Sequence, residues 1–102
     1  MPEEAEARAA QLIPESDCDL LVLGHTHKSY AIKHGEAMLL NPGSVGQPRD
    51  GDPRASYAMV EIAEGEINPR IHRVEYDIGG TQEKMRRLGL PESLVARLGL
   101  GR

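Results

Sequence analysis

Aromatic residues are almost absent from this sequence, which has three Tyr and no Phe or Trp among its 102 residues. A core must therefore be built from aliphatic side chains and methionine, and a chain of this length supports one domain at most. The single cysteine, Cys18, cannot form an internal disulfide and is typical of a reducing cytosol. No apolar run approaches the length of a membrane span. These absences predict a soluble, cytoplasmic protein.

Positive charge is also in short supply, because acidic residues outnumber basic ones and the formal net charge is −4. A nonspecific nucleic-acid surface needs a basic excess. The sequence therefore argues against nucleic-acid binding, and no membrane partner is expected.

The stretch from Asp19 to Pro48 is the most informative part of the chain. Four apolar residues, 20–23, run directly into Gly24, and His25 and His27 follow. A short apolar run bounded by turn residues predicts a strand buried on both faces. Ligands of α/β sheets bind at the carboxyl ends of strands, and imidazoles are common donors to divalent metals. The pattern predicts half of a metal site; the alternative is a pair of solvated histidines in a turn.

Two motifs in this stretch resemble the closing part of the calcineurin-like metallophosphoesterases, especially their small bacterial and archaeal phosphodiesterase branch. The first is Gly-His-Thr-His at 24–27, and the second is Asn-Pro-Gly-Ser-Val-Gly-Gln-Pro-Arg at 41–49. The resemblance implies an α/β fold, a four-layered α/β/β/α sandwich. It also implies two divalent metals, commonly manganese, iron, zinc or nickel, which activate a water that attacks a phosphoester. His25 and His27 would be ligands, one for each metal.

The family's other ligand motifs have no counterpart here, namely Asp-x-His, Gly-Asp-x-x-Asp, Gly-Asn-His followed by Glu or Asp, and a further His before the Gly-His-x-His strand. The chain is therefore interpreted as one partial domain, residues 1–102, equivalent to the C-terminal portion of a phosphoesterase. It would be inactive without an N-terminal half, and it would bind that half or self-associate. No catalytic residue is assigned, because the general acid would come from the absent half. The alternative is a non-catalytic binding or scaffold module.

The second motif offers candidates for contact with a phosphoester substrate. Backbone N–H groups in a Gly- and Ser-rich turn can bind an anion, and arginines add charge-assisted hydrogen bonds. Asn41, Ser44 and Arg49 are the candidates, with Arg54 as a further cation. The competing interpretation is a tight turn that only supports the metal site, and for Asn41 the choice stays open. Lys28 and Tyr30, just past the histidines, are further residues that can face a substrate.

The rest of the pattern predicts a helix in 1–14, a mixed or antiparallel sheet in 19–78 and a short helical tail in 79–102. Pro14 is expected to end the first helix. Gly35 and Glu64-Gly65 predict the turns of two hairpins, formed by 28–33 with 36–40 and by 55–63 with 67–77. The tail is expected to form two helices, the first beginning at Thr81 and ending at Gly89, the second closed by Gly99.

Smaller expectations concern individual side chains. Alternation within 55–63 is expected to place Ala58, Val60 and Ile62 on one face, and Ser56, Tyr57 and Glu61 on the other. His34, at a hairpin tip, and His72, on an edge strand, are not expected to bind metal. Cys18 is expected to be structural, with Asp17 or Asp19 forming turns.

Overall fold

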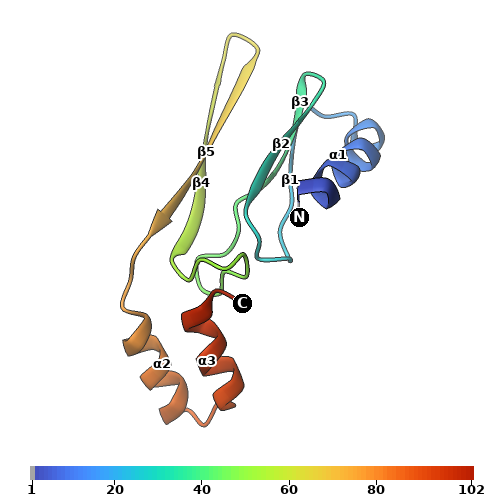
Figure 1. The fold of residues 1–102 in the computed structure, drawn as a ribbon. Helices are drawn as coiled ribbons and strands as arrows, with labels where there is room; N and C mark the ends of the chain where they lie inside the picture. Colours follow the sequence, from blue (N-terminus) through green and yellow to red (C-terminus); the bar gives the residue numbers. More distant parts are fainter. Residues whose placement is uncertain (1) are drawn as a thin grey trace.

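The structure, a computed structural model, describes residues 2–102 as three helices and five strands. Figure 1 shows helix α1 against a three-stranded sheet, a long β4–β5 hairpin beside that sheet on the side away from α1, and α2 with α3 packed together at one end. The molecule is elongated, 48 × 25 × 19 Å. The bounds are α1 Pro2–Ser16, β1 Leu20–Val22, β2 Tyr30–His34, β3 Ala37–Asn41, β4 Ala55–Ala63, β5 Glu66–Val74, α2 Ile78–Arg87 and α3 Glu92–Leu100.

Helix α1 continues through Pro14 to Ser16, so the expectation that Pro14 ends it was wrong. Proline removes one N–H donor, so the helix forgoes the bond to the Ala10 carbonyl, and it continues for only two residues beyond Pro14. The carbonyl of Ile13 accepts from the Asp17 N–H (3.2 Å) and from the Ser16 hydroxyl (3.0 Å), and these bonds close the helix. Asp17 then turns the chain with φ of 50°.

The three-stranded sheet has the order β1-β3-β2, with β1 parallel and β2 antiparallel to β3. The apolar strand β1 is therefore an edge strand, and Val22 is 53% exposed, which corrects the prediction of a strand buried on both faces. The central, fully covered strand is β3. Its Leu39 packs with Ala9 and Ile13 of α1 to form the core cluster.

The β4–β5 hairpin forms as predicted, turning at Glu64 and Gly65 with φ of 52° and 80°, although its second strand covers 66–74 and not 67–77. Two central residues with positive φ match the right-handed twist of the flanking strands. Ser56 is only 2% exposed and lies on the sheltered face with Ala58 and Val60. Its expected position on the opposite face was wrong, because residues two apart in a strand share a face.

The helical tail begins earlier and ends later than predicted. Helix α2 starts at Ile78 because the Asp77 carboxylate caps it, accepting from the Gly80 N–H at 3.0 Å. Helix α3 runs past Gly99 to Leu100 and is capped by Gly101, whose φ is 70°. Within the described residues, 2–102, none of the helices is long and apolar enough to cross a membrane.

Candidate metal centre

The loop that follows β1 holds both histidines in a left-handed backbone conformation. The φ angles are 78° at His25 and 61° at His27, a region that non-glycine residues occupy at a cost of about 1–3 kcal/mol each. Hydrogen bonds fix the loop at its start and within it. The Leu23 N–H donates to the Leu40 carbonyl (2.8 Å), and the Thr26 N–H donates to the Gly24 carbonyl (3.0 Å).

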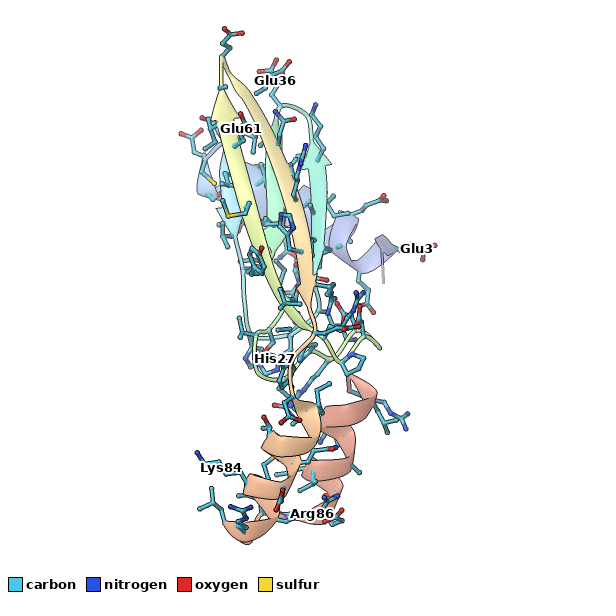
Figure 2. All side chains as sticks on the ribbon, turned by 90° about the vertical axis from the view of Figure 1, so that its left-hand side faces the viewer. Glu3, His27, Glu36, Glu61, Lys84 and Arg86 are labelled. Carbon is cyan, nitrogen blue, oxygen red and sulfur yellow. The ribbon has the colours of Figure 1, made fainter. Side chains whose placement is uncertain are left out.

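His27 is oriented by the second predicted loop. Its Nδ1 lies 2.9 Å from the carbonyl oxygen of Gln47, and its own carbonyl accepts from the Arg49 N–H at 2.9 Å. A carbonyl can only accept, so Nδ1 carries the proton and the Nε2 lone pair of the neutral ring is left for another partner. Metal-binding histidines typically have this second hydrogen bond. Figure 2 shows His27 in the region between the strands and the α2–α3 pair, whereas His25 is exposed.

Asn41 links the two loops from a fully buried position. It is 0% exposed, its Nδ2 donates to the Thr26 hydroxyl (3.1 Å), and its Oδ1 accepts from the Gly43 N–H (2.9 Å). Thr26 is the residue between the two histidines. Both ends of the Asn41 amide are therefore engaged inside the protein, and the side chain connects the histidine loop to the turn at Gly43.

Ser44 and Arg49 lie on the same loop but differ in how their side chains are engaged. The Ser44 hydroxyl accepts from the Gln47 N–H (2.9 Å), and its carbonyl accepts from the Ser56 N–H (3.0 Å). The Arg49 side chain is exposed and forms no ion pair within residues 2–102. Ser56, which sequence reasoning did not single out, donates its hydroxyl to the Pro42 carbonyl at 2.7 Å and so braces the turn.

A second group that sequence reasoning missed joins three distant segments next to this loop. Asp50 accepts from the Ser29 N–H (3.1 Å) and hydroxyl (2.7 Å), and it forms an ion pair with Arg73, which also donates to the Ser29 hydroxyl at 2.8 Å. Burial opposes ionisation of Asp50, but the hydrogen bonds from Ser29 and Arg73 outweigh it and lower the pKa of that carboxyl. No local pattern signals this cluster.

Arg54, expected as a free cation near the substrate, is paired instead. Its guanidinium contacts both carboxylate oxygens of Asp52, with Nε to Oδ1 at 3.1 Å and Nη2 to Oδ2 at 2.8 Å. Hydrogen bonds from the Arg54 side chain and backbone lower the pKa of Asp52 to about 2. Arg54 is therefore engaged by a neighbouring carboxylate, unlike Arg49.

The part of the chain that the structure describes holds no group of three His, Cys, Asp or Glu side chains that could bind a metal. His72 stacks on Tyr57 with ring centroids 4.9 Å apart, and Cys18 lies 3.0 Å from the Ser16 hydroxyl. The donor set at the loop is thus two imidazoles. That set suits a divalent metal but is smaller than a complete coordination sphere.

The mixed sheet with helices around it, and the two histidines that follow β1, place the chain among α/β domains with a loop site at the carboxyl end of a strand. Residues 2–65 match the calcineurin-like phosphoesterase superfamily domain, and the chain belongs to this family. Members of this family generally bind divalent metals. The fold class, α/β with mixed and antiparallel strands, is confirmed by the match to metallophosphoesterase structures.

Three relatives illustrate the likeness. An uncharacterized protein of Methanocaldococcus jannaschii is 39% identical over 99 residues, covering 82% of this chain and 40% of the relative. Phosphodiesterase YfcE of Escherichia coli is 51% identical over 43 residues, 42% of this chain and 23% of the enzyme. The crystal structure of a metallophosphoesterase from Sphaerobacter thermophilus matches with a TM-score of 0.77 and 42% identity, over 94% of this chain and 48% of that one. The chain spans about half or less of the length of these relatives.

Proposed function

We propose that this chain supplies His25 and His27 to a centre of two divalent metals, and that the whole protein is a metal-dependent phosphoesterase acting on phosphodiesters or monoesters. The observation that supports this most is the bond from His27 Nδ1 to the Gln47 carbonyl, which leaves Nε2 as a ligand. Bound manganese, iron, nickel or zinc would supply positive charge that polarises a phosphoryl group and makes a water more acidic. The proposed location is the cytoplasm.

The proposal requires further ligands from sequence outside these residues. The described part of the chain provides two imidazoles and no cluster that could complete the centre. We therefore propose that the remaining ligands and the general acid belong to an N-terminal half of the domain, and that this chain alone does not hydrolyse phosphoesters.

Residues of the second loop would bind the substrate phosphate. The Arg49 N–H bond to the His27 carbonyl keeps Arg49 next to the metal loop, and its exposed guanidinium suits a phosphate oxygen. Ser44 accepts through its oxygen, so its O–H remains a donor for the same phosphate. For Asn41, buried with both amide ends engaged, we propose a positioning role instead of substrate contact.

Metal binding by this chain tests the first part of the proposal. Titration with Mn²⁺ should broaden the amide resonances of residues around His25 and His27, because the ion is paramagnetic, and binding should weaken at acidic pH because ligands must lose their protons. The double variant His25→Ala, His27→Ala should lose the broadening. His34→Ala and His72→Ala, which remove imidazoles elsewhere, should keep it. Broadening that survives the double variant would show that the site was wrongly chosen.

Hydrolysis is tested in the longer protein with bis(4-nitrophenyl) phosphate as substrate. His27→Ala should lower metal-dependent turnover by about 100-fold or more, because it removes a ligand whose supporting contacts alone are worth about 10–100-fold. Arg49→Ala should mainly raise KM, because its guanidinium would bind the substrate phosphate. Full turnover in His27→Ala would contradict the proposal.

A further inference from the structure

A cleft of about 490 Å³ lies between α1 and the segment that leads into β2. It reaches Thr26, the residue between His25 and His27, and the other residues that line it lie outside the loops assigned to metal and phosphate. Besides two alanines of α1, the lining residues are Glu4, Arg8 and Gln11 of α1 and Thr26, Lys28 and Tyr30 of the second segment.

The charge of this cleft differs from that of the chain as a whole. Arg8 and Lys28 reach it from two separate elements, and in the described part of the chain neither forms an ion pair. Glu4 is the carboxylate among the lining residues, so the cations outnumber it, in a protein whose net charge is −4. Two unpaired cations around one space attract an anionic group and can donate charge-assisted hydrogen bonds to it.

The remaining lining residues add a flat surface and hydrogen-bond acceptors. Tyr30 is held against the core cluster formed by Ala9, Ile13 and Leu39, and its partly exposed side chain lines the cleft. Aromatic faces stack on planar rings and on cations. Glu4 and the Gln11 amide can accept from hydroxyl or amino groups. A ligand that matches all of these features has an anionic group, a planar ring and hydrogen-bond donors.

We propose that this cleft binds the leaving-group side of the phosphoester and favours a group with its own phosphate and a planar ring, as in a nucleoside phosphate. The inference rests on the proposed function, because that function places the scissile phosphate at the loop containing Thr26. Arg8 and Lys28 bind the anionic group, and Tyr30 contacts the ring. They are specificity residues and take no part in metal binding.

Binding of adenosine 5′-monophosphate to this chain, followed by amide chemical shifts in the presence of a metal chelator, tests the cleft directly. Saturable shifts should appear at Thr26, Lys28, Tyr30 and the first half of α1. Adenosine lacks the phosphate and ribose 5-phosphate lacks the ring, so each should bind about tenfold or more weakly, the equivalent of one lost interaction of about 1.4 kcal/mol. Arg8→Ala and Lys28→Ala should each weaken binding by about tenfold, as expected for a hydrogen bond to a charged group.

The controls separate a built site from general charge attraction. Lys84→Ala removes an exposed cation of α2, which Figure 2 shows at the end of the molecule with the helical pair, and it should leave the affinity unchanged. Lys28→Arg keeps the charge and should retain most of the binding. Wild-type amide positions away from the cleft verify the fold of each variant.

Three results would overturn the inference: shifts confined to the loop of Ser44 and Arg49, equal binding of adenosine, or equal loss in Lys84→Ala. Because the chelator removes metal, the result does not depend on hydrolysis. Cleft binding without metal binding at His25 and His27 would reject the proposed function, and with it the leaving-group role, while the cleft would stand as a nucleoside phosphate site. Metal binding and hydrolysis with no cleft binding would reject this inference alone.

Discussion

Asn41 shows how a single buried amide can set the geometry of a functional loop. Its two hydrogen bonds hold Thr26 on one side and Gly43 on the other, and no part of the side chain is exposed. Thr26 is exposed and Gly43 is half-buried, so removing the amide costs mainly its two hydrogen bonds, each worth about 0.5–1.5 kcal/mol. The orientation of the two histidines therefore depends on a residue that does not touch the metal in our proposal.

We predict that Asn41→Ala lowers the free energy of unfolding by about 2 kcal/mol, because the Thr26 hydroxyl and the Gly43 N–H lose their partner. The measurement is denaturant unfolding at neutral pH. Asn68→Ala removes an exposed amide from β5 and should change stability by less than about 0.5 kcal/mol. Equal, small effects of the two substitutions would show that the Asn41 bonds are not significant.

Asp50 is the second residue that holds other segments of the chain in place. It joins Ser29 to Arg73, and the side chains of Asp50 and Arg73 are only 16% and 15% exposed. We predict that Asp50→Asn lowers the free energy of unfolding by about 1–3 kcal/mol at neutral pH, because an amide replaces a charged acceptor of several hydrogen bonds. Glu61→Gln, a similar change at an exposed position of β4, is the control.

The pH dependence of that loss has a definite sign. The folded-state pKa of Asp50 is lowered, so its contribution to stability is fully present above the ordinary carboxyl pKa of about 4 and is lost as pH falls through the lowered pKa. The stability difference between wild type and Asp50→Asn should therefore shrink as the pH is lowered below about 4. A difference that stays constant down to pH 2, about two units below that ordinary value, would contradict this assignment.

At the scale of elements, the end of α3 is fixed against the loop after the metal centre. The Gly101 carbonyl accepts from the Gly51 N–H at 2.9 Å, and a Cβ on Gly101 would lie 2.7 Å from the Asp52 backbone nitrogen. Gly101 also has a φ of 70°, which glycine adopts without steric cost. The helical tail thus packs on the segment that carries Asp50 and Asp52.

We predict that Gly101→Ala lowers the free energy of unfolding by more than Gly89→Ala. Gly89 follows α2 with a φ of 76°, but a Cβ added there would meet no atom of the rest of residues 2–102 within 4 Å, its chain neighbours aside. That substitution therefore costs only left-handed strain of about 1–2 kcal/mol. Gly101→Ala adds a clash with backbone and should separate α3 from the loop. Thermal unfolding of both variants measures the difference, and equal losses would show that the contact at Gly101 is unimportant.

Elements marked by local signals could be predicted from the sequence. Gly35 and the Glu64-Gly65 pair predict two hairpin turns, because such turns need positive φ angles. Both hairpins form at these turns. The residues at which the helices begin and end were harder to predict from the sequence. Pro14 did not end α1, because two hydrogen bonds to the Ile13 carbonyl support the last turn, and Asp77 started α2 earlier through a side-chain cap.

The long-range part of the candidate site could not be predicted. His25 and His27 stand in a recognisable motif, yet the partner of His27 Nδ1 is 20 residues away, and Asp50 and Arg73 are 23 residues apart. Such pairs form only when the hairpins and loops are placed in space. The apolar run of β1 indicated a strand correctly, but its position at the edge of the sheet depends on which strands pair, and that is not encoded in the run itself.

At the scale of the whole molecule, the edge of the three-stranded sheet is open along β1. β1 pairs with β3 on one side only, and in the structure of residues 2–102 no second strand adjoins its other edge. Val22 on this strand is 53% exposed. An unpaired edge that carries an exposed apolar side chain is a template for another strand. We therefore expect this chain by itself to associate with a second copy or to bind a hydrophobic dye.

The last prediction concerns that edge. Val22→Lys should reduce self-association and dye binding, because a charged side chain on an edge strand opposes pairing with another chain. Val45→Lys makes the same change at an apolar residue that is 67% exposed but lies in a loop, and it should have little effect. Sedimentation velocity over a range of protein concentrations measures the association. A wild-type chain that stays monomeric and binds no dye would reject the open-edge prediction, and equal effects of the two lysines would assign the association to general hydrophobicity instead of β1.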